Sequence, residues 1–147
     1  YDKVHCQMHD LKYVPGKVLP VFDSHFGKFG VMICADRRWP ETSRTLSLKG
    51  ARVIFNPTYG MSCDLNLAMM RTRAYENEIF IAFTHPRQSL ITGPGGEVVV
   101  NDRRRNPPFT VTTIDLAAVD RVHGGRHSHL KDRRVDAYWD GRGRKVR

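Results

Sequence analysis

The chain has 147 residues, of which 40% are apolar and 27% charged, a balance that suits one globular domain and excludes disordered and collagen-like chains. No stretch approaches the ~20 consecutive apolar residues of a membrane span, so we expect no membrane segment. The three cysteines, Cys6, Cys34 and Cys63, are an odd number at wide spacing, which fits neither a disulfide framework nor a zinc site and favours a reducing, cytoplasmic setting.

Positive charge is concentrated near the C-terminus. The net charge is +9, and residues 103–147 contain 12 of the 24 Lys and Arg residues but only 5 of the 15 Asp and Glu residues. The basic runs at 103–105, 133–134 and 141–145 could neutralise phosphates, so a basic nucleic-acid-contacting domain is one alternative. These runs lack the interleaved aromatic residues of a single-strand binder and the metal ligands of a finger, which favours a solvated basic tail from about residue 123.

The first half of the chain predicts a strand–helix–strand unit with a paired strand before it. The expected elements are strands over 18–22 and 29–34, a helix over 40–49 and a strand over 52–55. Pro40 suits the first turn of the helix, and Gly50 supplies a left-handed end. A right-handed crossover makes the two flanking strands parallel neighbours, which would bring Cys34 and Asn56 together at the carboxyl edge of the sheet.

The second half predicts another helix and further strands. Apolar residues at helical spacing favour a helix over 64–77, and the run Gly93-Pro94-Gly95-Gly96 is typical of a turn between two strands. The remaining expected elements are strands over 78–84, 89–92, 97–100 and 109–116 and a short helix over 117–122. Because no internal repeat or linker interrupts this pattern, we expect a single α/β domain over residues 1–147.

Cys34 lies between an apolar strand and the polar stretch that precedes a helix. In such a turn the thiol is close to backbone amides and to Arg37 and Arg38, which favour the thiolate, and the N–H groups of the turn can bind a developing oxyanion. The setting therefore suits a nucleophile. A free cysteine acting only as a small buried apolar residue is the alternative that the spacing leaves open.

Several segments together carry a resemblance to a known family. Residues 30–41, read as Gly-Val-Met-Ile-Cys-Ala-Asp-Arg-Arg-Trp-Pro-Glu and followed by Asn56-Pro57, resemble the nucleophile segment of the nitrilase superfamily, the carbon–nitrogen hydrolases. The stretch 1–5 resembles the family's lysine segment, with Asp2 where Arg is usual, and 70–77 and 93–98 resemble its later helix and closing hairpin. This resemblance implies an α/β fold that is the second half of a four-layer α-β-β-α sandwich, incomplete at its N-terminus.

The resemblance also implies roles for two residues. Cys34 matches the nucleophile that forms a thioester, and Lys3 matches the cation that stabilises the tetrahedral intermediate. The family's general-base Glu precedes the lysine segment and has no match here, so we expect these 147 residues alone to be inactive. Asp10 is the only acid between Lys3 and Pro15-Gly16, a stretch where many members place a second carboxylate. No metal or organic cofactor is expected.

Substrate expectations come from the residues around the cysteine. The stretch Asp-Arg37-Arg38-Trp-Pro-Glu resembles that of N-carbamoyl-D-amino-acid amidohydrolases, which makes both arginines candidates to bind a substrate carboxylate. An ion pair with Asp36 or Glu41 is the alternative. Tyr59 could line the pocket or serve in packing alone. Its segment, 58–63, lacks the longer histidine-rich loop of carbamoylases.

We therefore expect hydrolysis of a non-peptide C–N bond in a small amide, N-carbamoyl compound or nitrile. The resemblance further implies a homo-oligomer. A catalytically inactive binding module of the same fold is the rival interpretation.

Overall fold

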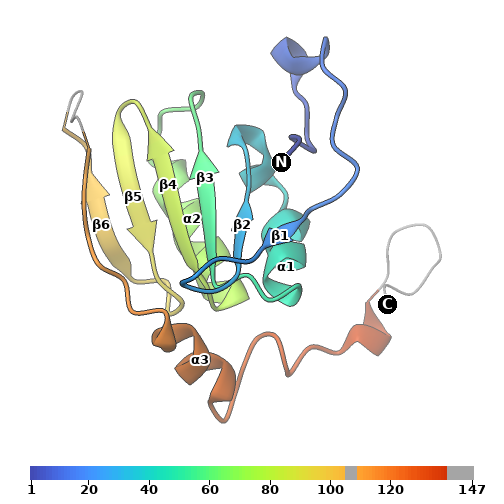
Figure 1. Cartoon of the computed structure of the whole chain (residues 1–147), viewed down its shortest axis with the longest axis vertical. Coiled ribbons are helices and arrows are strands. Elements are labelled where there is room, and N and C mark those ends of the chain that lie inside the picture. Colours follow the sequence, from blue (N-terminus) through green and yellow to red (C-terminus); the bar gives the residue numbers. More distant parts are fainter. Residues whose placement is uncertain (105–108, 139–147) are drawn as a thin grey trace.

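The computed structural model describes residues 1–104 and 109–138, which form one six-stranded mixed sheet with strand order β1-β2-β3-β4-β5-β6 (Figure 1). The strands are β1 (Val21–Phe22), β2 (Phe29–Val31), β3 (Val53–Pro57), β4 (Phe80–His85), β5 (Gln88–Thr92) and β6 (Val98–Asp102). The helices are α1 (Pro40–Leu48), α2 (Leu65–Asn77) and α3 (Ala117–Gly124), and short 3₁₀ turns cover Met8–Asp10, Cys34–Arg38 and Val135–Ala137. None of the described helices is long and apolar enough to cross a membrane.

The predicted strand–helix–strand unit is confirmed. β2 and β3 are parallel neighbours joined through α1, and β3 and β4 are parallel neighbours joined through α2. Gly50 follows α1 with φ of 93°, the left-handed conformation expected of it. Gly30 in β2 has a different role, since a Cβ there would lie 3.0 Å from Leu46 Cδ1. Its missing side chain lets α1 pack closely on the sheet.

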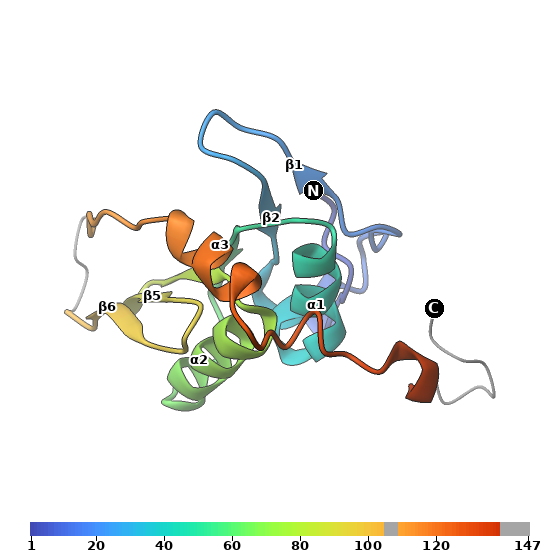
Figure 2. The same cartoon turned by 90° about the horizontal axis from the view of Figure 1, so that it is seen from below.

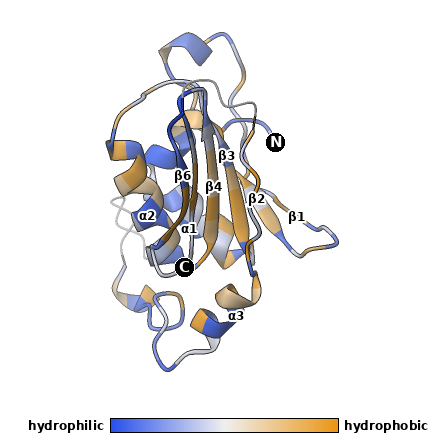
Figure 3. Cartoon of the chain, turned by 90° about the vertical axis from the view of Figure 1, so that its left-hand side faces the viewer, coloured by the Kyte–Doolittle hydropathy of each residue, from blue (hydrophilic) through white to orange (hydrophobic). Residues whose placement is uncertain are grey.

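The two faces of the sheet differ. α1 and α2 cover one face, where the fully buried side chains of Ile54, Ile81 and Leu90 pack (Figures 2 and 3). On the other face, one register row crosses the sheet with partly or fully exposed apolar residues: Val31, Phe55, Ala82, Ile91 and Val100. The arrangement is one helix layer on one sheet, as expected for half of an α-β-β-α sandwich.

The expected strand over 109–116 is wrong. Residues 109–116 pair with no strand. Ile114 and Leu116 instead pack with Val119 of α3 against Val53 and Phe80, at the end of the sheet where the parallel strands begin. Burial of these side chains over the end of the open face decides the path of this segment, whereas β-propensity alone would have placed it in the sheet.

Other elements differ only in length. β1 and β2 are shorter than expected, and β2 ends three residues before Cys34. The expected strand over 78–84 begins at Phe80, because Glu78 adopts φ of 54° and ψ of 45° at the end of α2. This left-handed residue ends the helix and turns the chain into β4.

Part of the basic C-terminal segment is anchored to α2. The carboxylate of Glu78 accepts hydrogen bonds from Ser128 Oγ at 2.7 Å and from the backbone N–H of His129 at 2.6 Å. These hydrogen bonds thus hold the segment after α3 against the C-terminal end of α2 at residues 128–129. The basic run 141–145 lies outside the described residues, as does Arg105.

Candidate active site

Cys34 opens the 3₁₀ turn that follows β2. The backbone N–H of Met32 donates to Phe55 O at 2.9 Å, and Asn56 Nδ2 donates to Met32 O at 2.8 Å, so β3 holds the chain two residues before the cysteine. Cys34 itself has φ of 47°, which is uncommon for a residue with a side chain. Both the cysteine and Asn56 therefore lie at the carboxyl edge of the parallel strands, as the strand–helix–strand unit predicted, and Asn56 holds the chain that leads into Cys34.

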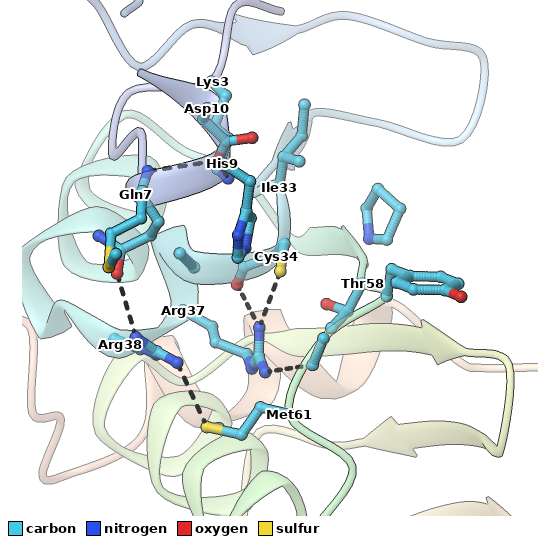
Figure 4. A pocket seen from close by; sticks show the side chains of 15 residues that line it. Lys3, Gln7, His9, Asp10, Ile33, Cys34, Arg37, Arg38, Thr58 and Met61 are labelled. Atoms are coloured by element: carbon cyan, nitrogen blue, oxygen red, sulfur yellow. Dashed lines mark hydrogen bonds and ion pairs between the residues drawn. The ribbon is translucent and has the colours of Figure 1, made fainter. Parts of the chain in front are cut away.

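Arg37 is buried directly behind the cysteine and is only 1% exposed. Its Nη1 donates to Cys34 O at 2.5 Å and lies 3.7 Å from Cys34 Sγ (Figure 4). Its Nε donates to Asn66 Oδ1 at 3.1 Å, and its Nη2 donates to Gly60 O at 3.2 Å. The guanidinium also lies 5.7 Å from the centre of the Phe83 ring. One side chain thus joins the cysteine turn, the loop after β3 and the first turn of α2.

The surroundings of Cys34 lower the pKa of its thiol. Burial by itself raises the pKa, but the backbone N–H groups of Gly60 and Tyr59 and the Arg37 guanidinium together more than offset it. Each of these groups stabilises negative charge on sulfur. These groups therefore make the thiolate, the nucleophilic form of cysteine, easier to form than in a free cysteine.

Lys3, from the N-terminal segment, lines the same pocket as the cysteine. Its ammonium forms an ion pair with Asp10, and both residues line the same pocket as Cys34. The hydrogen bond from Lys3, followed by the one from the Gln7 backbone N–H, lowers the pKa of the Asp10 carboxyl. The 3₁₀ turn Met8–Asp10 brings this carboxylate back to the lysine, a contact that sequence spacing did not predict.

Asp36 ties the lysine segment to the cysteine turn. Its buried carboxylate accepts hydrogen bonds from Tyr1 Oη at 2.7 Å, His5 N at 2.8 Å and Ile33 N at 2.9 Å. Burial and the Asp36 carboxylate raise the pKa of Tyr1, and the His5 ring stacks on Trp39 with centroids 4.1 Å apart.

Neither Arg37 nor Arg38 pairs with an acidic side chain in the described part of the chain, so the alternative of a structural ion pair to Asp36 or Glu41 is wrong.

The structure brings all five candidate residues to one pocket of about 690 Å³: Lys3, Cys34, Arg37, Arg38 and Tyr59. Arg38 is the more accessible arginine, and its guanidinium makes only a 3.2 Å contact to Gln7 Oε1 and a 3.6 Å contact to Met61 Sδ. Tyr59 is 85% exposed. Among the residues that the structure describes, Asp10 is the one acidic residue that lines this pocket, whereas Glu41 and Glu76 line a separate small pocket beside Arg44.

The comparisons with known proteins identify the family of this chain. Residues 1–123 match the family model of the carbon-nitrogen hydrolases, and the chain belongs to this family.

The similar proteins are nitrilases and amidases. The chain is 34% identical to a nitrilase of Pyrococcus abyssi, covering 95% of this chain and 58% of that protein. It is 30% identical to an N-carbamoylputrescine amidase of Arabidopsis thaliana, covering 80% of this chain and 48% of that protein. The fold resembles that of a carbon-nitrogen hydrolase from Helicobacter pylori, with a TM-score of 0.79, 21% identity and coverage of 92% and 58%. The chain thus spans about half the length of these relatives.

Proposed function

We propose that the intact protein hydrolyses the C–N bond of a small amide or N-carbamoyl compound through a thioester on Cys34. The observation that carries this proposal is the shared pocket, in which a thiol of lowered pKa lies with the Lys3–Asp10 pair. A thiolate and a cation for the oxyanion are two of the groups that acyl transfer from nitrogen requires.

The chemistry proceeds in two halves. The Cys34 thiolate attacks the carbonyl carbon, and Lys3 together with backbone N–H groups stabilises the negative charge that moves to oxygen. Collapse of this intermediate breaks the C–N bond, and the departing nitrogen takes a proton from the acid form of the base, which is then free to deprotonate water. Water then attacks the thioester carbon, loses a proton to a base, and expels the thiolate. We assign the base to the family's Glu, which has no counterpart in this chain.

The substrate class follows from the two arginines. Four donor contacts hold the Arg37 guanidinium inside the protein, whereas the Arg38 guanidinium contacts just Gln7 and Met61 among the described residues. We assign to Arg38 the binding of a substrate carboxylate, because a guanidinium binds a carboxylate with two parallel hydrogen bonds. The similarity to N-carbamoylputrescine amidases supports an N-carbamoyl group at the reacting end.

Selective alkylation tests the assignment of the nucleophile. We expect iodoacetamide to label Cys34 of the intact protein first and to abolish ammonia release in proportion to labelling. The exposed Cys63 is the internal control, and peptide mass spectrometry would follow both sites. Loss of activity that tracks labelling of Cys63 would overturn the assignment, and rapid Cys34 labelling in a protein that hydrolyses no amide, ureido acid or nitrile would favour the binding module.

We also expect no turnover from the 147 residues alone. A positioned general base commonly contributes about 10²–10⁴-fold to such reactions, and Asp10 already pairs with Lys3. Steady-state ammonia release by the purified 147-residue chain would contradict this expectation.

A further inference from the structure

Arg37 is a buried cation without a carboxylate partner in the described part of the chain. Its acceptors are the backbone oxygens of Cys34 and Gly60 and the amide oxygen of Asn66, and no Asp or Glu among residues 1–104 and 109–138 forms an ion pair with it. Burying an uncompensated charge is costly even when its hydrogen bonds are made, and buried charges in proteins are generally paired. Burial indeed lowers the pKa of Arg37. We therefore expect one of the groups in contact with the Arg37 guanidinium to carry a compensating negative charge.

One such group is the sulfur of Cys34. It lies 3.7 Å from Arg37 Nη1, and it is the one contact of this guanidinium that gains negative charge by losing a proton. Asp36 is closest in sequence, but its carboxylate faces Tyr1, His5 and Ile33 on the other side of the turn. The neighbouring Arg38 is exposed and contacts Gln7 and Met61 instead.

We propose that Arg37 is a positioning residue that keeps Cys34 as a thiolate in the resting enzyme and holds its left-handed turn in place, rather than a residue that binds substrate. The inference rests on the proposed function of Cys34 as nucleophile. The two parts of the role come from one atom, because Nη1 donates both to Cys34 O at 2.5 Å and to Cys34 Sγ. The contacts to Asn66 and Gly60 fix that atom from two further elements.

The pair has a consequence for the reaction. Attack on the carbonyl carbon transfers the negative charge from sulfur to oxygen. When the C–N bond breaks, the nitrogen leaves with a proton from the acid form of the base, which keeps the charge, so the thioester leaves Arg37 without its anion. Hydrolysis of the thioester releases sulfur as thiolate and restores the ion pair. Arg37 therefore favours expulsion of the product from Cys34, since the charged leaving group is the form that it stabilises.

The first test uses the unmodified intact protein. The rate of iodoacetamide alkylation is measured at Cys34 and at Cys63 across a range of pH, by mass spectrometry of the two peptides. Because the thiolate is the reacting form, each rate profile reports the pKa of its own thiol. We expect the midpoint for Cys34 to lie below that for the exposed Cys63. A midpoint at or above that of Cys63 overturns the proposal without any variant.

The second test separates charge from hydrogen-bond geometry. Arg37→Gln removes the charge, and we expect the alkylation rate of Cys34 at pH 7 to fall about tenfold or more, as its midpoint moves to higher pH by about one unit. Arg37→Lys keeps a cation and should restore most of that rate. Arg38→Gln removes the same charge from an exposed site one residue away and should change the Cys34 profile far less. Circular dichroism would establish that each variant is folded.

The outcomes distinguish this proposal from the proposed function. A Cys34 profile that Arg37→Gln leaves unchanged, in a protein that still hydrolyses its substrate, would mean that Arg37 only braces the turn. A profile that shifts as expected in a protein that hydrolyses no C–N bond would support the ion pair and overturn the proposed activity instead. An equal shift in Arg37→Gln and Arg38→Gln would also contradict the proposal, because a general electrostatic effect would then explain it.

Discussion

A buried charged side chain lies beside each end of α2, and the two side chains differ in the groups that compensate their charge. Near its beginning, Asn66 contacts Arg37, which is 1% exposed; just after its end lies Glu78, also 1% exposed. The Glu78 carboxylate accepts hydrogen bonds from Ser128 and His129, and the rings of His123 and His129 lie 3.6 and 3.4 Å from its oxygens. Arg37 meets no acidic side chain in the described residues, only neutral oxygens and a thiol.

This difference in compensation suggests that the Glu78 charge stabilises the fold, whereas we assign the Arg37 charge to the candidate active site. Glu78 is surrounded by donors, and its contacts join segments about 50 residues apart in the chain, so its burial serves the fold. Arg37 has its hydrogen bonds but lacks a permanent counter-ion among the described residues, and the group beside it is the thiol that we propose as the nucleophile. A buried charge whose compensation depends on the ionisation of its neighbour is typical of an active site.

The largest expected effect is the loss of turnover when the sulfur of Cys34, beside Arg37, is removed. Cys34→Ala should lower turnover by at least about 10⁴-fold, since loss of a nucleophile removes the covalent route altogether. Cys63→Ala is the matched control and should retain activity, because Cys63 is exposed and does not line the pocket. Ammonia release by both variants, normalised to folded protein, is the measurement. Substantial turnover by Cys34→Ala would show that Cys34 is not the nucleophile, and the contrast between Arg37 and Glu78 would then have no bearing on catalysis.

A second variant distinguishes the exposed arginine from the buried one. Arg38→Ala should lower kcat/KM for an N-carbamoyl amino acid by tens- to thousands-fold, because a desolvated charge pair that loses one partner costs on the order of 2–5 kcal/mol. The value for the corresponding carboxamide should barely change. Arg37→Ala should instead lower both values to a similar extent. If Arg38→Ala also affects both substrates equally, its assignment to a carboxylate is wrong.

The Glu78 end should respond in stability and not in catalysis. Glu78→Ala leaves Ser128 Oγ and His129 N without their buried acceptor, and the free energy of unfolding should fall by about 2–4 kcal/mol. Glu78→Gly should recover roughly 1 kcal/mol of this loss, because φ at this position is 54° and glycine adopts that conformation without strain. Urea unfolding of the three proteins is the measurement. Equal stability of the alanine and glycine variants would show that the backbone at Glu78 is unstrained.

The smallest expected effect is a pH dependence of stability at the Arg37 end. The pKa of Cys34 is lowered in the folded protein, so the thiolate stabilises the fold fully above the unfolded pKa of about 8.5. That contribution is lost as the pH falls through the folded pKa, and each unit of lowering corresponds to about 1.4 kcal/mol. The difference in Tm between wild type and Cys34→Ser should therefore grow from mildly acidic pH to about pH 9. A difference that stays constant with pH would contradict a folded-state thiolate.

Much of the architecture was predictable from local patterns. Pro40 and Gly50 bound a helix, the apolar stretches on either side of it favour strands, and a crossover of that length makes its strands parallel. The place of Cys34 at the carboxyl edge follows from those elements alone. The motif around Cys34 likewise indicated the family that the comparison with residues 1–123 shows. These features depend on neighbours within a few residues, and the sequence by itself determined them.

Tertiary structure decided what depends on distant partners. The 109–116 stretch has strand-like residues, but the open end of the sheet offered burial beside Val119. Arg37 and Arg38 are adjacent and chemically alike, yet one faces Asn66 and Gly60 inside the protein and the other faces the pocket. Burial, charge compensation and the choice of hydrogen-bond partner are properties of the packed chain, and no local pattern encodes them.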